Sequence, residues 1–372
     1  MELDEFRRGL DRWLDERGDA LSAVSASTLD EHVEHTSAVK RAVFEAGWGR
    51  WGWPERVGGL GGSTLLRAYL GEALTLRNLV DPGVYSMAEV LLPTMITYAG
   101  TRLAADMVPR HLSGAETWCQ GFSEPDTGSN LAALACRAVV TDTGWRVNGQ
   151  KVWTSLAQFA ARCTLLVRTG EPESRHRGIT ALFVDMDSPG ITVRPIETMH
   201  GRPEFCEVFF EDVDVPADRT LGDPGQGWAI AMDLLPFERS SSLWHRGALL
   251  HRRFDALLAE GEAMTPAEVG ETFTNLYAFR ARSLATQHRV ARAGAIGAET
   301  SVDKVLIAAA EQSLFDLAGE AIADRVLFGG DPASTAWRAD VIYSRAASIY
   351  GGSSEIQRNI IAKRLLDLGD DR

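Results

Sequence analysis

The chain has 372 residues and a formal net charge of -13 at pH 7, which leaves room for roughly two or three domains with a sizeable core. Nucleic-acid-binding proteins present clustered positive charge, so this acidic chain argues against a nucleic-acid partner. Its cysteines, Cys119, Cys136, Cys163 and Cys206, stand far apart and lack metal-ligand spacing, so we expect free thiols and no metal site.

The N-terminal part, residues 1–114, reads as a helical domain. Val39, Val43 and Trp48 recur at helical spacing, and residues 65–79 and 89–98 show the same periodicity. The first residues are charged and lack the apolar segment of a secretory signal. No stretch approaches the roughly 18 apolar residues of a membrane span. We therefore expect a cytoplasmic protein without membrane insertion.

The middle part, residues 115–223, changes to short β-branched and apolar runs bounded by turn residues, a texture typical of strands. Strands are expected at 163–168, 179–184, 191–194 and 205–213. The Asn148–Gly149 pair lies between two such runs, which predicts a β-hairpin. This part is expected to be a small β-barrel or sandwich.

Helical periodicity returns in residues 224–372 and predicts a bundle of about four helices. Thr300 and Asp303 are compatible with a capping box at the start of one helix. The order of helices, strands and helices places the chain in the α+β class. The apolar face of the helix that follows Thr300 is marked by Val302, Val305, Leu306, Ala309, Ser313, Leu317, Ala321 and Ile322.

Two short segments of the middle part have the composition of a flavin site. They are Phe122–Ala133 (FSEPDTGSNLAA) and, seventeen residues later, Gln150–Ser155 (QKVWTS). Reduction of a flavin places negative charge on its pyrimidine side, where hydrogen-bond donors are favourable. Ser123 and Ser155 can supply such donors. Trp153 offers an aromatic surface for the ring, and Gly128 and Ser129 suit a place where the backbone must approach a ligand closely.

Together these segments resemble the middle domain of the acyl-CoA dehydrogenase family, with Asn130 where Asp is usual. The resemblance covers nearly the whole chain, because the three parts follow in the family's order. It implies an N-terminal helical domain, a middle β-barrel domain, a C-terminal four-helix bundle and an FAD cofactor. It also implies that the flavin is lined by Gln120, Phe122, Ser123, Gly128, Ser129, Trp153, Ser155, Ser353 and Glu355, and that Ser129 approaches the acyl-CoA.

The same resemblance predicts the position of the catalytic base. In many members a Tyr-Glu-Gly-Thr segment near the C-terminus supplies the Glu, and here that position is Gly351. Other members carry the base earlier, in a Leu-Glu-Arg sequence that Phe237-Glu238-Arg239 resembles. We therefore expect Glu238 to be the base and the backbone N–H of Gly351 to face the thioester carbonyl. Phe237 and Arg239 are expected at the acyl-CoA.

Simpler structural roles stay open for several of these residues. Glu238 could be a helix-surface Glu paired with a nearby Arg, and Ser353 with Glu355 could be a helix cap with its first-turn carboxylate. The predicted activity is FAD-dependent α,β-dehydrogenation of an acyl-CoA, with electrons passed to an electron-transfer flavoprotein. The alternatives are a non-catalytic partner subunit, a flavin oxidase or hydroxylase, and a dehydrogenase of carrier-protein thioesters.

The segments through which homotetrameric members grip a neighbour's FAD are altered. No Arg-x-x-Phe segment occurs in 251–273, and Val326–Gly330 lacks the Gln of the family's Gln-x-x-Gly-Gly turn. These departures resemble a bacterial subgroup that handles bulky acyl-CoAs such as steroid side chains. Two assemblies stay open, a homo-oligomer and an α2β2 heterotetramer with a related subunit.

Overall fold

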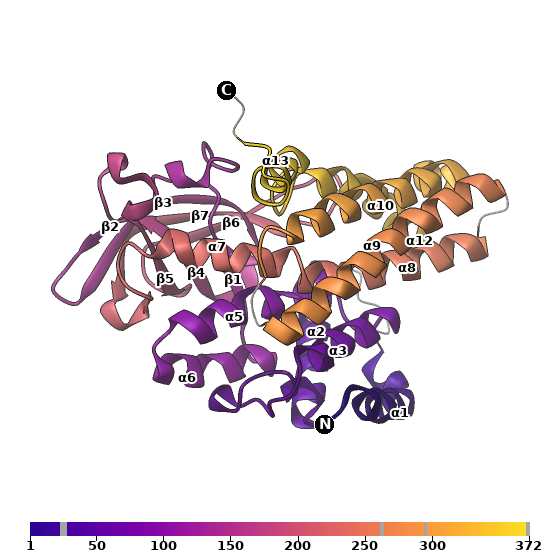
Figure 1. Cartoon of the computed structure of the whole chain (residues 1–372), viewed down its shortest axis with the longest axis horizontal. Helices are drawn as coiled ribbons and strands as arrows, with labels where there is room; N and C mark the ends of the chain where they lie inside the picture. The colour runs from indigo at the N-terminus through magenta and orange to yellow at the C-terminus, as the bar shows by residue number, and fades with distance from the viewer. Residues whose placement is uncertain (23–27, 261–263, 294–295, 370–372) are drawn as a thin grey trace.

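The computed structural model describes residues 1–22, 28–260, 264–293 and 296–369. Figure 1 shows three parts, with the N-terminal helices at the bottom of the view, the β-sheet at the left and the long C-terminal helices at the right. This order of helices, sheet and helices confirms the predicted α+β fold.

The N-terminal part is helical, as predicted. Helix α2 begins at a capping box, in which Thr28 and Glu31 each bond the other's backbone N–H. Apolar residues of α1, α2 and α3 share one core, while α5 and α6 join a second core that includes strands of the sheet. The helices are α1 (Leu3–Leu21), α2 (Leu29–Glu45), α3 (Thr64–Leu76), α4 (Pro82–Tyr85), α5 (Met87–Tyr98) and α6 (Thr101–Leu112), with single-turn helices η1 (Trp48–Arg50) and η2 (Glu55–Val57).

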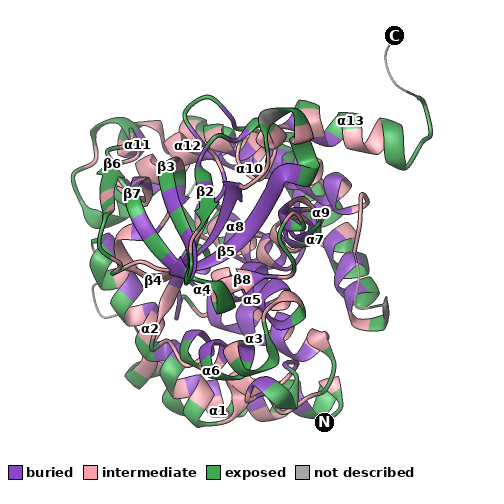
Figure 2. Ribbon diagram, turned by 90° about the vertical axis from the view of Figure 1, so that its left-hand side faces the viewer, coloured by how far each residue is buried: buried purple, intermediate pink, exposed green. Residues whose placement is uncertain are grey.

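The middle part is one eight-stranded sheet of order β6-β7-β3-β2-β4-β5-β8, with β1 paired parallel to β4. Its path has two ends, β6 and β8. Figure 2 shows buried positions concentrated on the strands at the centre of the molecule. The strands are β1 (Thr117–Gly121), β2 (Arg137–Val140), β3 (Gly144–Ser155), β4 (Ala160–Arg168), β5 (Ile179–Asp185), β6 (Ile191–Ile196), β7 (Phe205–Pro216) and β8 (Thr220–Leu221). Between them lie the 3-10 helices η3 (Leu131–Ala133), η4 (Ala157–Phe159), η5 (Pro172–Gly178), which is kinked at Arg175, and η6 (Ala217–Arg219).

The predicted hairpin at Asn148–Gly149 is wrong. β3 continues through both residues, and its register with β7 shifts between Val147 and Gly149. Asn148 Nδ2 donates to Asp212 Oδ1 at 3.0 Å, and Asp212 itself has a left-handed φ of 52°. The Asn-Gly pair therefore lies opposite a β-bulge in β7, where Glu211 and Asp212 face the single residue Asn148.

The C-terminal part is also helical. Apolar residues of α8, α9, α10 and α12 share one core, represented by Leu250, Phe279, Leu314 and Trp337. The elements are α7 (Gly227–Glu238), α8 (Ser241–Glu260), α9 (Pro266–Ala293), α10 (Thr300–Ala321), α11 (Ala323–Phe328), α12 (Pro332–Tyr343), the single-turn helix η7 (Ser344–Ser348) and α13 (Ser354–Arg364).

Helix α7 connects the sheet to the C-terminal helices. Its Ile230, Ala231 and Leu234 are fully buried in the core formed by α5, α6 and the sheet. Pro236 cannot donate a backbone hydrogen bond and disfavours continuation of the helix, which ends at Glu238. Glu238 consequently lies where the sheet and the helical parts meet.

Helices α3 and α8 approach closely at Gly71. A Cβ added to Gly71 would lie 2.1 Å from Nε2 of His245, which is fully buried. We expect Gly71→Ala to lower the free energy of unfolding by about 2 kcal/mol, because overpacking outweighs the gain in helix propensity. Urea denaturation measures the change. Gly18→Ala in α1 is the control, since nothing lies within 4 Å of the added methyl, and it should stabilise by up to about 1 kcal/mol. Equal effects at both positions would contradict the expectation.

Candidate active site

A buried ion pair joins the two segments that predicted a flavin site. Lys151 Nζ lies 2.7 Å from Glu124 Oε1, and the Lys151 side chain has no exposed area. The carboxylate of Glu124 also accepts the backbone N–H groups of Ala135 and Cys136 at 2.6 and 2.9 Å. Sequence reasoning assigned no role to Glu124 or Lys151. The available signal was a charged residue inside each segment, one acidic and one basic.

Strand β3 is distorted where it carries Trp153. The φ angles of Trp153 and Leu156 are 58° and 60°, in a left-handed region that non-glycine residues rarely adopt and that recurs at functional sites. The Trp153 ring is 58% exposed and lies edge-on to Phe205, with the ring centroids 6.0 Å apart. Half-buried Ser155 follows two residues later. The strand thus presents an open aromatic plane beside a hydroxyl.

Strand β1 brings Gln120 to Glu238. Gln120 Nε2 lies 3.4 Å from Glu238 Oε2, while Gln120 Oε1 is buried without a hydrogen-bond partner in the described part of the chain. Phe122 is buried and Ser123 half-buried. The Ser123 carbonyl accepts the N–H of Val152 at 3.0 Å, which ties the first segment to β3. The sheet and α7 therefore meet at the Gln120–Glu238 contact.

Gly351 faces the same carboxylate from the C-terminal side. Its φ is 62°, and a Cβ built on it would lie 3.2 Å from Glu238 Oε1 and 3.2 Å from Lys304 Cε. The two positions considered for the base are therefore neighbours in space. Of the two, Glu238 alone carries a carboxylate.

Arg239 holds the Gly351 turn through one intermediate side chain. Arg239 Nη1 donates to Gln357 Oε1, and Gln357 Nε2 donates to the Gly351 carbonyl, each at 3.3 Å. Burial lowers the pKa of the Arg239 guanidinium, and Glu238 opposes that shift. Glu238 is half-buried, as is Phe237 beside it. The end of α7 and the Gly351 turn thus form one hydrogen-bonded unit.

Other predicted site residues make no contact with Glu238 in the structure. Ser353 caps α13, accepting the N–H of Ile356 at 3.3 Å, and exposed Glu355 lies 3.7 Å from Arg358. In this structure Ser353 is therefore a helix cap and Glu355 a first-turn carboxylate, which is the simpler structural role that the sequence left open. Gly128 and Ser129 are exposed. Contacts of these four residues with a flavin or an acyl-CoA stay predictions.

The arrangement around β1 and β3 fits a flavin. Gln120 offers a buried oxygen that lacks a donor, and Trp153 offers an exposed ring on a strained backbone. A planar ligand with N–H donors and an apolar edge would satisfy both. In the described ranges no three His, Cys, Asp or Glu side chains gather as a metal site would require, and no helix there combines the length and apolarity of a membrane span.

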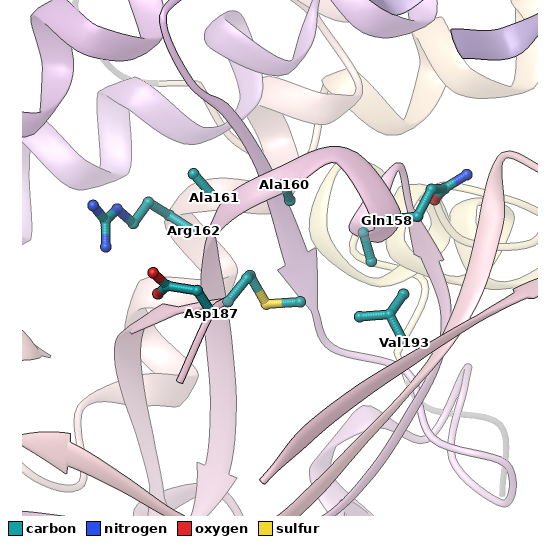
Figure 3. A pocket seen from close by; sticks show the side chains of 8 residues that line it. Gln158, Ala160, Ala161, Arg162, Asp187 and Val193 are labelled. Atoms are coloured by element: carbon teal, nitrogen blue, oxygen red, sulfur yellow. The ribbon is translucent and has the colours of Figure 1, made fainter. Parts of the chain in front are cut away.

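A cavity of about 440 Å³ opens elsewhere, along η4, β4 and β6. Figure 3 shows Arg162 and Asp187 on one side of it and Gln158 and Val193 on the other. Neither Glu238 nor Gly351 lines it. We place the candidate active site at Glu238, because side chains from β1, α7 and α10 converge there with the Gly351 turn.

Neutralising Lys151 provides a stability test of this framework. Lys151→Met should lower the free energy of unfolding by about 3–5 kcal/mol, because it breaks a buried ion pair by removing one partner and leaves Glu124 buried without its cation. Arg146→Met on the same strand is the control. Its partner Asp214 lies 2.9 Å away, but both side chains are largely exposed, so the loss should stay below about 1 kcal/mol. Similar losses in urea denaturation would refute a framework role for Lys151.

Comparisons with known proteins identify the family of the chain. The family model described as "Acyl-CoA dehydrogenase, middle domain" matches residues 119–213, and "Acyl-CoA dehydrogenase, C-terminal domain" matches residues 225–366. Acyl-CoA dehydrogenase IpdE1 of Mycobacterium tuberculosis is 35% identical over 381 residues, covering 99% of this chain and 98% of the relative.

Solved structures share the fold over the full chain. The "Tcur3481-Tcur3483 steroid ACAD" matches with a TM-score of 0.83 at 24% identity, covering 100% of this chain and 98% of that one. The ChsE4-ChsE5 complex from Mycobacterium tuberculosis matches with a TM-score of 0.77 at 25% identity, covering 99% and 98%. The chain belongs to the acyl-CoA dehydrogenase family of FAD-dependent oxidoreductases.

Proposed function

We propose that this chain catalyses the α,β-dehydrogenation of an acyl-CoA thioester to the trans-2-enoyl-CoA, with Glu238 as the base. The observation that carries the proposal is the position of the Glu238 carboxylate, which lies between Gln120 and the Gly351 turn. A general base must be held within hydrogen-bond reach of the proton that it removes. Anchoring by Gln120 on one side and confinement by Gly351 on the other supply that restraint.

Two hydrogens leave the substrate in this reaction. The α-hydrogen leaves as a proton to Glu238, the β-hydrogen leaves with its electron pair as a hydride, and the α–β double bond forms. When bound, FAD supplies the acceptor for that hydride. We assign Gln120, Phe122, Ser123, Gly128, Ser129, Trp153, Ser155, Ser353 and Glu355 to holding the cofactor.

Gly351 acts on the thioester in this proposal. As the α-proton leaves, negative charge develops on the thioester oxygen, and the Gly351 N–H donates to it. One such donor contributes about 3 kcal/mol to stabilisation of the transition state. Ser129, Phe237 and Arg239 line the path of the acyl-CoA.

For the acyl group we propose a bulky chain of the steroid side-chain type. The supporting observation is the full-length fold likeness to a protein described as a steroid ACAD. Such a substrate belongs to lipid or steroid degradation in the cytoplasm, with an electron-transfer flavoprotein as electron acceptor.

Assembly with further subunits belongs to the same proposal, as a homo-oligomer or an α2β2 heterotetramer. Leu327 and Phe328 precede the altered Gly-Gly turn and are 64% and 81% exposed. Exposed large apolar residues grouped in this way are typical of protein interfaces. A solved relative is described as the ChsE4-ChsE5 complex, which pairs two different subunits.

The test is a panel of short, branched, long and steroid acyl-CoAs given to the purified protein under anaerobic conditions with an artificial electron acceptor. We expect a yellow protein whose flavin absorbance bleaches with the bulky substrates. A colourless protein that gains flavin and activity only with a related subunit would favour the partner-subunit alternative. Substrate-dependent oxygen consumption would favour an oxidase, and activity with carrier-protein thioesters alone would favour that substrate class.

A further inference from the structure

Lys304 of α10 is buried behind Glu238 and Gly351. Its side chain is 1% exposed, and its ammonium donates to the Ala347 carbonyl, four residues before Gly351. The ammonium also lies 4.7 Å from the centroid of the Tyr350 ring. Lys304 therefore connects α10 to the turn that places Gly351 against the Glu238 carboxylate.

The charged groups around Lys304 come from the C-terminal end of α7 and from α10 itself. Glu238 and Arg239 act on it from α7, and Glu311 acts from its own helix, α10. Glu311 already has a cation, because Arg246 of α8 contacts both of its oxygens at 2.6 and 3.0 Å. Glu238 has no ion pair within 4.0 Å in the described part of the chain.

Arg239 is the other cation facing this carboxylate, but its guanidinium is engaged by Gln357. Tyr350 completes the surroundings, and its hydroxyl donates to Glu311 at 3.4 Å. Burial lowers the pKa of Lys304 to about 8, while Glu311 and Glu238 oppose that shift. An ammonium with this pKa is still mostly charged at neutral pH.

We propose that Lys304 is a positioning residue for proton abstraction: its hydrogen bond to Ala347 fixes the turn that places Gly351 against the Glu238 carboxylate. The inference rests on the proposed function, because it assigns Lys304 a role through the Gly351 turn. Loss of the hydrogen bond should let the turn move relative to the base, and a displacement approaching 1 Å at a reacting group costs about 10²-fold in rate.

The rate of flavin bleaching in anaerobic single turnover tests this positioning effect. In Lys304→Met, which removes the donor to Ala347, we expect the rate to fall by about tenfold to a hundredfold. Lys304→Gln keeps a donor for Ala347 and should recover most of that rate. A defect that comes only from lost stability would slow both variants alike, and urea denaturation of each variant measures that contribution.

Lys40→Met is the matched control, since Lys40 of α2 is also buried and its charge acts on His111 of α6. Its bleaching rate should stay within about twofold of the wild type. A wild-type rate in Lys304→Met overturns the inference, as does an equal loss of rate in both Lys304 variants. Failure of both variants to fold also overturns it, because Lys304 would then belong to the folding framework. Glu238→Gln in the same series separates the two claims, since retained turnover there would reject the proposed base itself.

Discussion

Glu238→Gln is expected to abolish turnover while the protein keeps its fold and its flavin. The amide has nearly the same shape as the carboxylate and can still contact Gln120, but it cannot accept the substrate α-proton. Positioned general bases contribute about 10²–10⁴-fold, so kcat should fall by at least that range. The rate of flavin bleaching in anaerobic single turnover reports this step directly, before any electron acceptor intervenes.

Asp233→Asn is the matched control for that substitution. Asp233 is exposed on the same helix, and its carboxylate accepts the Tyr98 hydroxyl. It faces neither Gln120 nor Gly351, so the control should retain kcat within about twofold. If Glu238→Gln bleaches at the wild-type rate, the base lies elsewhere. If both substitutions abolish turnover, the loss comes from damage to α7.

The division into helices, sheet and helices was predictable because periodicity repeats over long segments. The strands expected at 163–168, 179–184, 191–194 and 205–213 lie within β4, β5, β6 and β7. The contact between Glu238 and Gly351 could not be predicted from the spacing of residues in the sequence, since 112 residues separate them. The family resemblance nominated each residue separately, and only the fold brings them together.

The buried face of α10 was predicted only in part. Leu317 and Ile322 of the predicted face are buried. Near the start of the helix, however, Ala309 is exposed and Val302 and Val305 are only half-buried. The buried side includes Asp303 and Lys304, together with Glu311. Charged residues normally indicate a solvent-facing surface, so the rule failed where ion pairs and hydrogen bonds compensate for burial. Lys304 was missed for this reason.

The start of α10 shows the same effect on a smaller scale. Thr300 does not cap the helix. Its hydroxyl donates to the Gly297 carbonyl, while Asp303 lies 3.1 Å from Arg282 of α9. Burial raises the pKa of Asp303 to about 7, with Arg282 acting in the opposite direction. A local sequence pattern does not predict this tertiary contact. The contact uses the Asp303 side chain, which a capping box would need.

Gly351→Ala is expected to lower kcat by about tenfold to a hundredfold. The added methyl would lie 3.2 Å from Glu238 Oε1 and 3.2 Å from Lys304 Cε, closer than carbon normally approaches either atom. Glu238 is held by Gln120 and Lys304 by Ala347, so relief requires that the base or the turn move. Displacements approaching 1 Å at a reacting group cost about 10²-fold in rate.

Comparison with Gly201→Ala separates the effect of backbone strain from the effect of the added methyl on Glu238 and Lys304. Gly201 also has a left-handed φ, 82°, but nothing lies within 4 Å of its added methyl. Both substitutions should therefore lose a similar 1–2 kcal/mol of folding free energy, roughly the cost of a left-handed alanine, which urea denaturation measures. Only Gly351→Ala should slow anaerobic flavin bleaching. Equal rates in the two variants would mean that the close approach of Gly351 to Glu238 and Lys304 plays no part in the reaction.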